Sequence, residues 1–195
     1  MTMNRNYPRT IASEDGELEL RLLTAPDEAA VLAFAKKLSA HDLLFLPRDI
    51  SQPKVVSAWV QANAAGSIVT LLVTRKGAVL GCATIVRDDL SWSSHVGELR
   101  VIVAPELRGK GVGQTLTQEC FAIALELGLE KLIAQKTVDQ RGAIAVFEGL
   151  GFRAEALLHE QVKDRDGKKH DIVILSHDVA KFQAQMQAYG LTDAF

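Results

Sequence analysis

A glycine-rich loop is the part of the sequence whose residue types and spacing can do chemistry most directly. Gly109, Gly111 and Gly113 alternate with other residues just after Arg108 and around Lys110, between a β-branched run and a long helical pattern. Glycine lets the backbone approach a ligand closely and adopt positive φ. Successive amides of such a loop, together with the start of a helix, form a cradle for anions. The segment therefore predicts a site for a phosphate-bearing ligand, with two basic side chains adding positive charge.

Two common nucleotide-binding patterns do not fit this loop. A P-loop requires Gly-x-x-x-x-Gly-Lys-Ser/Thr, and residues 109–115 do not supply it. A dinucleotide fingerprint requires Gly-x-Gly-x-x-Gly, and after Gly109 and Gly111 the third glycine position holds Gln114. The spacing therefore excludes both patterns as the explanation of the loop.

A third pattern does fit. The stretch from Arg108 to Gly113 matches Arg/Gln-x-x-Gly-x-Gly/Ala, and it resembles the acetyl-CoA signature of the GNAT superfamily of N-acetyltransferases. Residues 141–152 are similar to that family's later helix, which ends in a Leu-Gly-Phe corner before the next strand. The likeness covers about residues 17–177. It implies an α/β fold of GNAT type, which is a mixed, mostly antiparallel sheet with a central splayed parallel pair, flanked by helices on both faces.

The resemblance implies acetyl-CoA as co-substrate and an amine as acceptor. Neither a metal nor a covalent enzyme intermediate is expected, because the amine attacks the thioester directly. In the family, pantetheine fills the gap between the splayed strands, so its amides would bond backbone groups of Val101 and Val103. Main-chain amides of residues 108–113 would hold the pyrophosphate. The residues that the resemblance assigns to acetyl-CoA are Val101, Ile102, Val103, Arg108, Gly109, Lys110, Gly111, Val112, Gly113, Gln114, Gln140 and Phe147.

Glu98 is the candidate catalytic residue, because many family members carry a carboxylate at the start of this strand. A carboxylate there would take the proton of the attacking amine. Spacing along a regular strand points the Glu98 side chain away from that of Val101, unless a bulge intervenes. The alternative is an ordinary strand-end or supporting carboxylate. Ser93, Ser94 and His95 lie just upstream, where they either relay a proton through water or have no role.

The sequence departs from the family at two positions. Phe147 stands where the family often has a tyrosine, thought to protonate the leaving CoA thiolate, and phenylalanine has no proton to donate. A common asparagine is replaced by Gln140, or by Asp139 in a shifted register. Because a thiolate is a tolerable leaving group, we expect turnover to depend only modestly on Phe147. The alternative function is a non-catalytic acyl-CoA-binding or sensing module.

Hydrophobic periodicity and turn residues predict the elements that must position these groups. Strands alternate with helices in the middle of the chain, and antiparallel strands come first and last, which is typical of a mixed α/β fold. Strands are predicted over residues 17–23, 67–74, 78–86, 96–103, 131–136, 153–163 and 168–177, and helices from residue 26 onward and over 54–64, 111–127, 139–150 and 179–189.

The same patterns predict a flexible arm over residues 1–16 and a C-terminal helix and tail over 179–195, and the family resemblance implies an N-acetyltransferase domain over 17–178. The C-terminal helix is a candidate homodimer surface. Residues 41–50 are an apolar-rich connection that forms either core or one wall of the acceptor pocket. They carry no acidic cluster for a polyamine, which leaves a small amino compound or a peptide or protein amino group as acceptor. His170, in the last hairpin, is a structural residue or an acceptor contact.

Composition excludes several classes of protein. The 195 residues, 48% hydrophobic and 24% charged, suit one globular domain. A net charge of -2 gives little support to a nucleic-acid or acidic-membrane binder. No run of about 18 apolar residues is present to span a bilayer. Cys82 and Cys120 lie in apolar stretches as small hydrophobes, so we expect a reducing compartment, most simply the cytoplasm.

Overall fold

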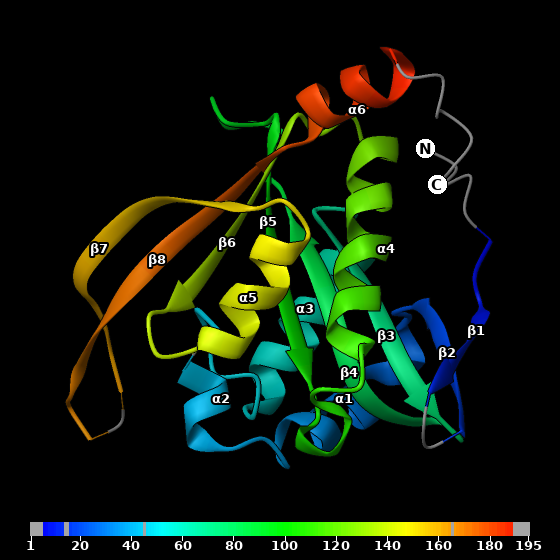
Figure 1. Ribbon diagram of the computed structural model, residues 1–195. Coiled ribbons are helices and arrows are strands. Elements are labelled where there is room, and N and C mark those ends of the chain that lie inside the picture. The colour runs from blue at the N-terminus through cyan, green and yellow to red at the C-terminus, as the bar shows by residue number, and fades with distance from the viewer. Residues whose placement is uncertain (1–5, 14–15, 45, 165, 189–195) are drawn as a thin grey trace.

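One mixed sheet forms the centre of the molecule (Figure 1). The computed structural model describes residues 6–13, 16–44, 46–164 and 166–188. Eight strands follow the order β1-β2-β3-β4-β5-β6-β8-β7, and every neighbouring pair is antiparallel except β5 with β6. The predicted fold class is confirmed. The strands are β1 Arg9–Ser13, β2 Gly16–Leu22, β3 Ile68–Arg75, β4 Ala78–Val86, β5 Val96–Val103, β6 Lys131–Thr137, β7 Arg153–Lys163 and β8 Lys169–Asp178.

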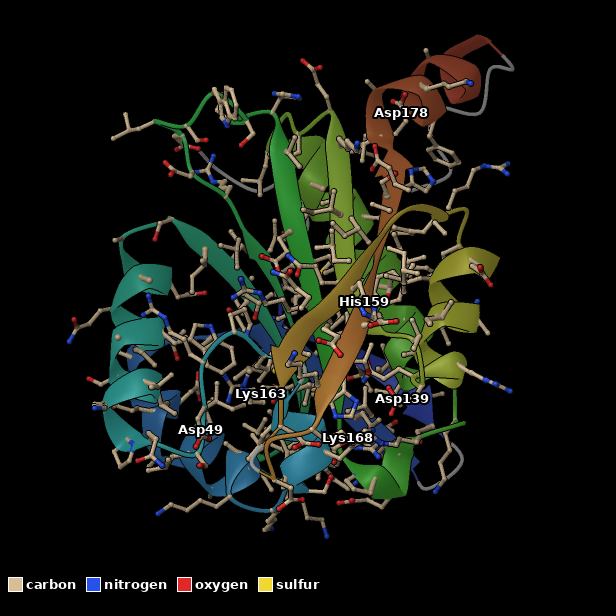
Figure 2. The ribbon with its side chains drawn as sticks, turned by 90° about the vertical axis from the view of Figure 1, so that its left-hand side faces the viewer. Asp49, Asp139, His159, Lys163, Lys168 and Asp178 are labelled. Carbon is tan, nitrogen blue, oxygen red and sulfur yellow. The ribbon has the colours of Figure 1, made fainter. Side chains whose placement is uncertain are left out.

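Helices cover both faces of the sheet, and each layer packs on its own apolar cluster. Figure 2 shows α3 on one side of the sheet and α5 on the other. The β7–β8 hairpin lies towards the viewer, with its tip near the labelled Lys163 and Lys168. One layer holds η1 Ala25–Asp27, α1 Glu28–Ala35, α2 Ala40–Leu44 and α3 Pro53–Ala64, and the other holds α4 Val112–Glu126 and α5 Arg141–Gly149. The short turn η2 Pro105–Leu107 precedes α4, and α6 Val179–Ala188 packs against α4.

One strand and one α-helix were not predicted. Part of the expected arm forms β1, which pairs with β2 along its whole length. The arm is tied down because Tyr7 and Arg9 donate hydrogen bonds of 2.9 and 2.6 Å to the Glu119 carboxylate of α4, 112 and 110 residues away. The unpredicted helix, α2, spans Ala40–Leu44, so it begins one residue before the connection over residues 41–50. The predicted tail beyond residue 188 lies outside the described residues.

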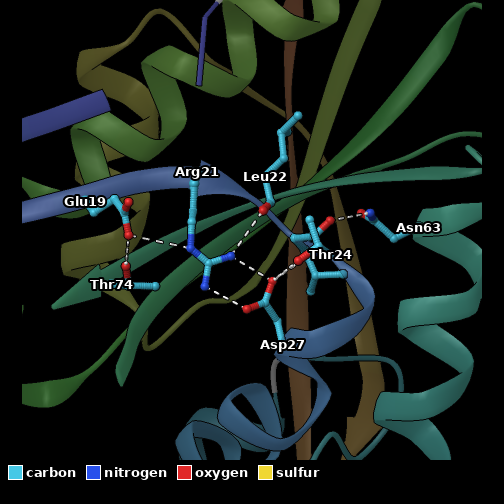
Figure 3. A network of polar contacts seen from close by, with 8 residues as sticks. Glu19, Arg21, Leu22, Thr24, Asp27, Asn63 and Thr74 are labelled. Carbon is cyan, nitrogen blue, oxygen red and sulfur yellow. Dashed lines mark hydrogen bonds and ion pairs between the residues drawn. The ribbon is translucent and has the colours of Figure 1, made fainter. Parts of the chain in front are cut away.

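A partly buried ion pair fixes the corner between β2 and the first helical layer (Figure 3). Arg21 donates two hydrogen bonds of 2.7 Å to the Asp27 carboxylate, and the Thr24 amide donates another of 2.8 Å. The bond from Arg21 lowers the pKa of Asp27 to about 2, against the effect of burial. The Asn63 amide of α3 donates to the Leu23 carbonyl at 3.1 Å. These contacts hold α1 and α3 at a fixed position relative to the sheet.

The parallel pair at the centre separates along its length. Residues 96–98 of β5 pair with residues 131–133 of β6, and the pairing ends there. Beyond that point β5 runs on to Val103 and β6 to Thr137 without pairing to each other. The predicted splay is therefore present, and it leaves one edge of each strand facing a gap.

Gly97 lies where the two strands still touch, and its missing side chain makes that approach possible. A Cβ atom at this position would lie 2.6 Å from Leu129 Cδ1, 3.1 Å from Leu132 Cδ2 and 3.2 Å from Ile85 Cγ2. We therefore expect Gly97→Ala to lower the free energy of unfolding by about 1–3 kcal/mol through overpacking. Urea unfolding followed by circular dichroism measures this change.

Gly142→Ala is the matched control for this substitution. Gly142 lies in α5, and a Cβ atom there would meet nothing within 4 Å. Alanine is the better helix former, so this variant should gain about 0.5–1 kcal/mol. An unchanged free energy of unfolding for Gly97→Ala would contradict the close approach of β5 and β6.

Candidate active site

A cavity of about 660 Å³ lies in the gap between β5 and β6 and reaches the first turns of α4 and α5. It brings together residues that are up to about a hundred positions apart in the sequence, from His41 to Phe147. The predicted residues that line it are Glu98, Val101, Ile102, Val103, Arg108, Gly109, Gly111, Gly113, Gln114, Gln140 and Phe147. Lys110 and Val112 do not line it, and the Val112 side chain is buried in the core instead.

The glycine loop has the open geometry that an anion cradle requires. Gly109 and Gly111 have φ values of +75° and +77°, which side-chain-bearing residues rarely adopt. A Cβ atom at either position would meet nothing within 4 Å, so the space above the loop is free for a ligand. Gly111 is the N-cap of α4, and no side chain caps that helix end. The first amides of α4 are therefore available to an anion.

Arg108 is committed to protein contacts rather than being a free cation of the loop. Its Nη2 lies 2.6 Å from Asp42 Oδ1 of α2, and its Nε lies 3.3 Å from the Val103 carbonyl. Burial acts to raise the pKa of Asp42, but hydrogen bonds from Arg108 and Ser39 outweigh it and hold the pKa below its usual value. Arg108 thus joins α2 to the end of β5, and the uncapped start of α4 adds positive potential to the cradle.

Glu98 lies at the base of the gap and forms an ion pair with Arg100. Its two carboxylate oxygens accept hydrogen bonds of 2.9 and 2.7 Å from Arg100 Nε and Nη2. Because β5 keeps a regular register with β4 from Glu98 to Val103, Glu98 projects to the face opposite Val101, as predicted. Both still line the cavity, because the cavity occupies the edge of β5 rather than one of its faces.

Gln140 offers a hydrogen bond to a ligand in the cavity. It is the N-cap of α5, and its Oε1 is buried without a hydrogen-bond partner among the described residues. A buried acceptor left unpaired costs free energy, and an N–H or O–H group of a bound pantetheine chain would satisfy it. Together with the open glycine loop, this orphaned atom makes the cavity chemically suited to CoA.

Family membership follows from a comparison of the whole sequence. Residues 21–152 match the family described as "Acetyltransferase (GNAT) family". The chain belongs to the GNAT acetyltransferase family. Over 87 residues it is 35% identical to a Bacillus subtilis (strain 168) protein named "Putative phosphinothricin acetyltransferase YwnH". That match covers 45% of this chain and 53% of the relative, so the chain spans about half of the relative's length.

Solved GNAT structures share the fold. A GNAT acetyltransferase from Streptococcus pneumoniae superposes with a TM-score of 0.73 at 20% identity, covering 83% of this chain and 99% of that one. The yncA protein of Salmonella typhimurium, solved with acetyl-CoA, gives 0.69 at 20% identity over 83% of this chain and 94% of its own. Acetyl-CoA is typical of the family.

Several predicted candidates are not brought to the cavity. His170 lies 2.8 Å from Asp164 within the last hairpin and lines neither of the two cavities described here. Ser93, Ser94 and His95 do not line them either. In the described part of the chain no cluster of His, Cys, Asp and Glu could hold a metal ion, and no helix is long and apolar enough to cross a membrane.

The two cysteines are buried, as predicted. Burial raises the pKa of the Cys82 thiol to about 12 and that of Cys120 well above its usual value. Reactive cysteines have lowered pKa values instead. Both residues therefore behave as small hydrophobic side chains.

Lys136 is the functional candidate that sequence reasoning missed. It lines the cavity from β6, is only 5% exposed, and places its Nζ 5.2 Å from the centre of the Phe147 ring. Burial lowers its pKa to about 8, with the Glu98 charge acting in the opposite direction. The sequence does hold a signal, because Lys136 continues the inward alternation of Leu132 and Ala134.

A second cavity of about 400 Å³ adjoins the first and shares Leu46, Arg100 and Ile102 with it. Its wall is mainly apolar, with Trp59 among its residues, and Arg48 and Arg100 supply its charged groups. No described carboxylate lines it. Leu43 of the connection over residues 41–50 is buried in the core, and Leu46 lines both cavities. The part these residues play in an acceptor pocket stays a prediction.

Proposed function

We propose that this GNAT protein transfers the acetyl group of acetyl-CoA to an amine by direct attack of the amine on the thioester. The observation that carries the proposal is one continuous cavity running from the open N-terminus of α4 to the gap between β5 and β6. Acetyl-CoA, when bound, supplies an activated acyl group. The chain supplies the cradle, an unpaired strand edge and ionisable side chains beside them.

The glycine loop and β5 are the parts that would hold the co-substrate. Amides from Gly109 to Gly113 would bind its diphosphate, as helix N-termini do. The edge of β5 from Val101 to Val103 has no strand partner on the side of the gap, so its backbone groups would bond the amides of pantetheine. Gln140 Oε1 would accept one further hydrogen bond.

The Glu98–Arg100 pair would connect the acceptor to the thioester. Arg100 lines both cavities and Glu98 lines the first, so an amine entering through the second cavity meets this pair first. Glu98 would take the proton that the amine loses on attack, either directly or through one water molecule. Arg100 would hold the carboxylate in place through its two hydrogen bonds.

The second cavity limits the chemical class of the acceptor. Arg48 and Arg100 carry positive charge there, and no described carboxylate lines the wall. Glu98 offsets the charge of Arg100 through two hydrogen bonds, so a polyamine would meet repulsion mainly from Arg48. A primary amine with a neutral or anionic apolar body fits this lining better. Small amino compounds and the amino group of a peptide or protein both meet that description.

Glu98→Gln tests the proton-accepting role. With an amine that the wild type acetylates, we expect kcat to fall by about 100-fold, the lower end of the range for general bases, because water can also take the proton. The dissociation constant of acetyl-CoA should stay within a factor of three or so, since its proposed contacts lie elsewhere. Release of the CoA thiol measures the rate, and calorimetry measures binding.

Glu148→Gln is the matched control, because Glu148 is an exposed carboxylate of α5 outside both cavities. It should leave kcat unchanged. Wild-type turnover in Glu98→Gln would remove Glu98 from the reaction and leave it as a partner of Arg100.

A non-catalytic acyl-CoA-binding or sensing module is the second candidate function. It is favoured by Phe147, which is buried against Phe152 at a ring distance of 5.0 Å and has no proton to give. Micromolar binding of acetyl-CoA without turnover across a broad panel of amines would support it over the enzyme. The cytoplasmic location and the homodimer stay predictions.

A further inference from the structure

Lys136 is a buried cation that the proposed reaction does not yet use. We propose that its ammonium group lies at the CoA sulfur and protonates the thiolate as the carbon–sulfur bond breaks. This inference rests on the proposed acetyl transfer. It assigns to β6 the proton donor that Phe147 of α5 cannot be.

The register of the parallel strands places Lys136 at the level of the thioester. Glu98 pairs with Ile133, which is the last pair between β5 and β6. Three residues further along each strand come Val101 and Lys136, which would face each other had the pairing continued. The strands have separated there, so Lys136 lies across the cavity from the stretch of β5 that would hold the end of the pantetheine chain.

The surroundings of Lys136 leave its ammonium group without a hydrogen-bond acceptor. The side chain is 5% exposed, its Nζ lies over the Phe147 ring at 5.2 Å, and no described residue accepts a hydrogen bond from it. A buried charge without a partner costs folding free energy. Its position on the wall of the cavity means that a ligand can supply the missing partner, and a thiolate is a suitable anion.

The charged neighbours of Lys136 come mainly from β5. Glu98 favours the protonated ammonium group and Arg100 disfavours it. From β8 the cross-strand partner is Val173, which carries no charge. The other titratable side chains that line the cavity are His41, Asp42, Arg108, Asp139 and Arg141.

The proton balance of the step is simple. The amine nitrogen bonds to the acetyl carbon and loses one proton to Glu98, while the sulfur leaves with the electron pair of the carbon–sulfur bond. Lys136 gives one proton to that sulfur, becomes a neutral amine and regains a proton from solvent. Burial lowers the pKa of Lys136 to about 8, close to the reference value of about 8.5 for a thiol, so the transfer is nearly balanced in free energy.

The kinetic test uses Lys136→Met and Lys136→Arg. A methionine side chain has neither a charge nor a proton to donate. An arginine side chain keeps the positive charge but does not release a proton near neutral pH. We expect both to lower kcat by about 100-fold, with acetyl-CoA affinity little changed in Lys136→Met. The wild-type rate should decline above about pH 8, where Lys136 loses its proton, and this decline should disappear in Lys136→Met.

Lys131→Met is the matched control, because Lys131 lies on the same strand but pairs with Glu155 at 2.6 Å outside the cavity. Its kcat and pH profile should equal those of the wild type. A Lys136→Met variant with the wild-type rate and pH profile would overturn the proposal.

A second measurement needs no turnover. CoA bound to the wild type should form its thiolate, detected by ultraviolet absorbance, at a pH at least about one unit lower than CoA bound to Lys136→Met, a tenfold change in acidity. If no amine is acetylated by the wild type, the proposed function fails, and this difference still supports the placement of Lys136 at the sulfur. Identical thiol titrations in the two proteins would overturn that placement.

Discussion

Gly111→Glu is expected to weaken acetyl-CoA binding by at least about 1,000-fold, because juxtaposed like charges cost several kcal/mol. Gly111 is the N-cap of α4, and the direction of its missing side chain is open to the cavity that it lines. A glutamate there would fill the cradle and set a carboxylate against the diphosphate. Calorimetric titration of acetyl-CoA and of CoA into both proteins measures the loss.

Gly128→Glu is the control that separates this effect from backbone strain. Gly128 follows the other end of α4, has a φ of +70° close to the +77° of Gly111, and also has open space around it. Both substitutions force a side-chain-bearing residue into the left-handed region, at about 1–2 kcal/mol each. Of the two variants, only Gly111→Glu should lose the binding of acetyl-CoA. Equal affinity of the two variants would mean that the loop is not a CoA cradle, and the proposed enzyme would fall with it.

Lys136→Met is expected to raise the free energy of unfolding by about 3 kcal/mol at pH 7. The basis is the lowered pKa of Lys136, about 8 against the ordinary 10.5, because every tenfold change in acidity on folding corresponds to about 1.4 kcal/mol. Methionine has a similar volume without the charge, so it removes the cost of burying an unpaired ammonium group. Urea unfolding measures the gain, and a variant that is more stable but less active would identify Lys136 as a residue kept for function.

The pH dependence of stability gives the same test a second readout. Between about pH 8 and 10.5 the unfolded chain keeps the Lys136 proton while the folded chain has lost it. The unfolded state then binds more protons, so the stability of the wild type should rise with pH in this window. Lys136→Met should lack that rise.

The two cysteine thiols make the stability fall as the pH rises, because their pKa values are raised in the folded state. They are present in both proteins, so the difference between the two curves isolates Lys136. A Lys136→Met protein that is less stable than the wild type at neutral pH would show that the ammonium group makes a stabilising contact.

Local sequence was enough to predict the cradle. Positive φ at Gly109 and Gly111, the start of α4 and the strand before it depend on neighbours within a few residues. Backbone sterics and helix ends act over that range. The alternation of β5 likewise predicted that Glu98 and Val101 point to opposite faces, as the regular register requires.

Contacts between distant residues were not predictable in this way. Arg108 meets Asp42 across 66 positions, so its charge is used within the protein rather than left free in the loop. The Glu119 carboxylate similarly holds the chain around Tyr7 and Arg9, which turned part of an expected arm into β1. Nothing in the local sequence marks such partners, because the interaction exists only after the chain has folded.

For Lys136, the local sequence predicted one property and the tertiary structure decided another. The alternation from Leu132 through Ala134 determines that its side chain points inward. Alone, that pattern does not distinguish a lysine paired in the core from one facing a ligand. The tertiary structure decided it, because β5 and β6 separate just before Lys136 and replace a neighbouring strand with a cavity. The sequence by itself determined the loop and the faces of the central strands, and the divergence of two strands decided which side chains line the cavity.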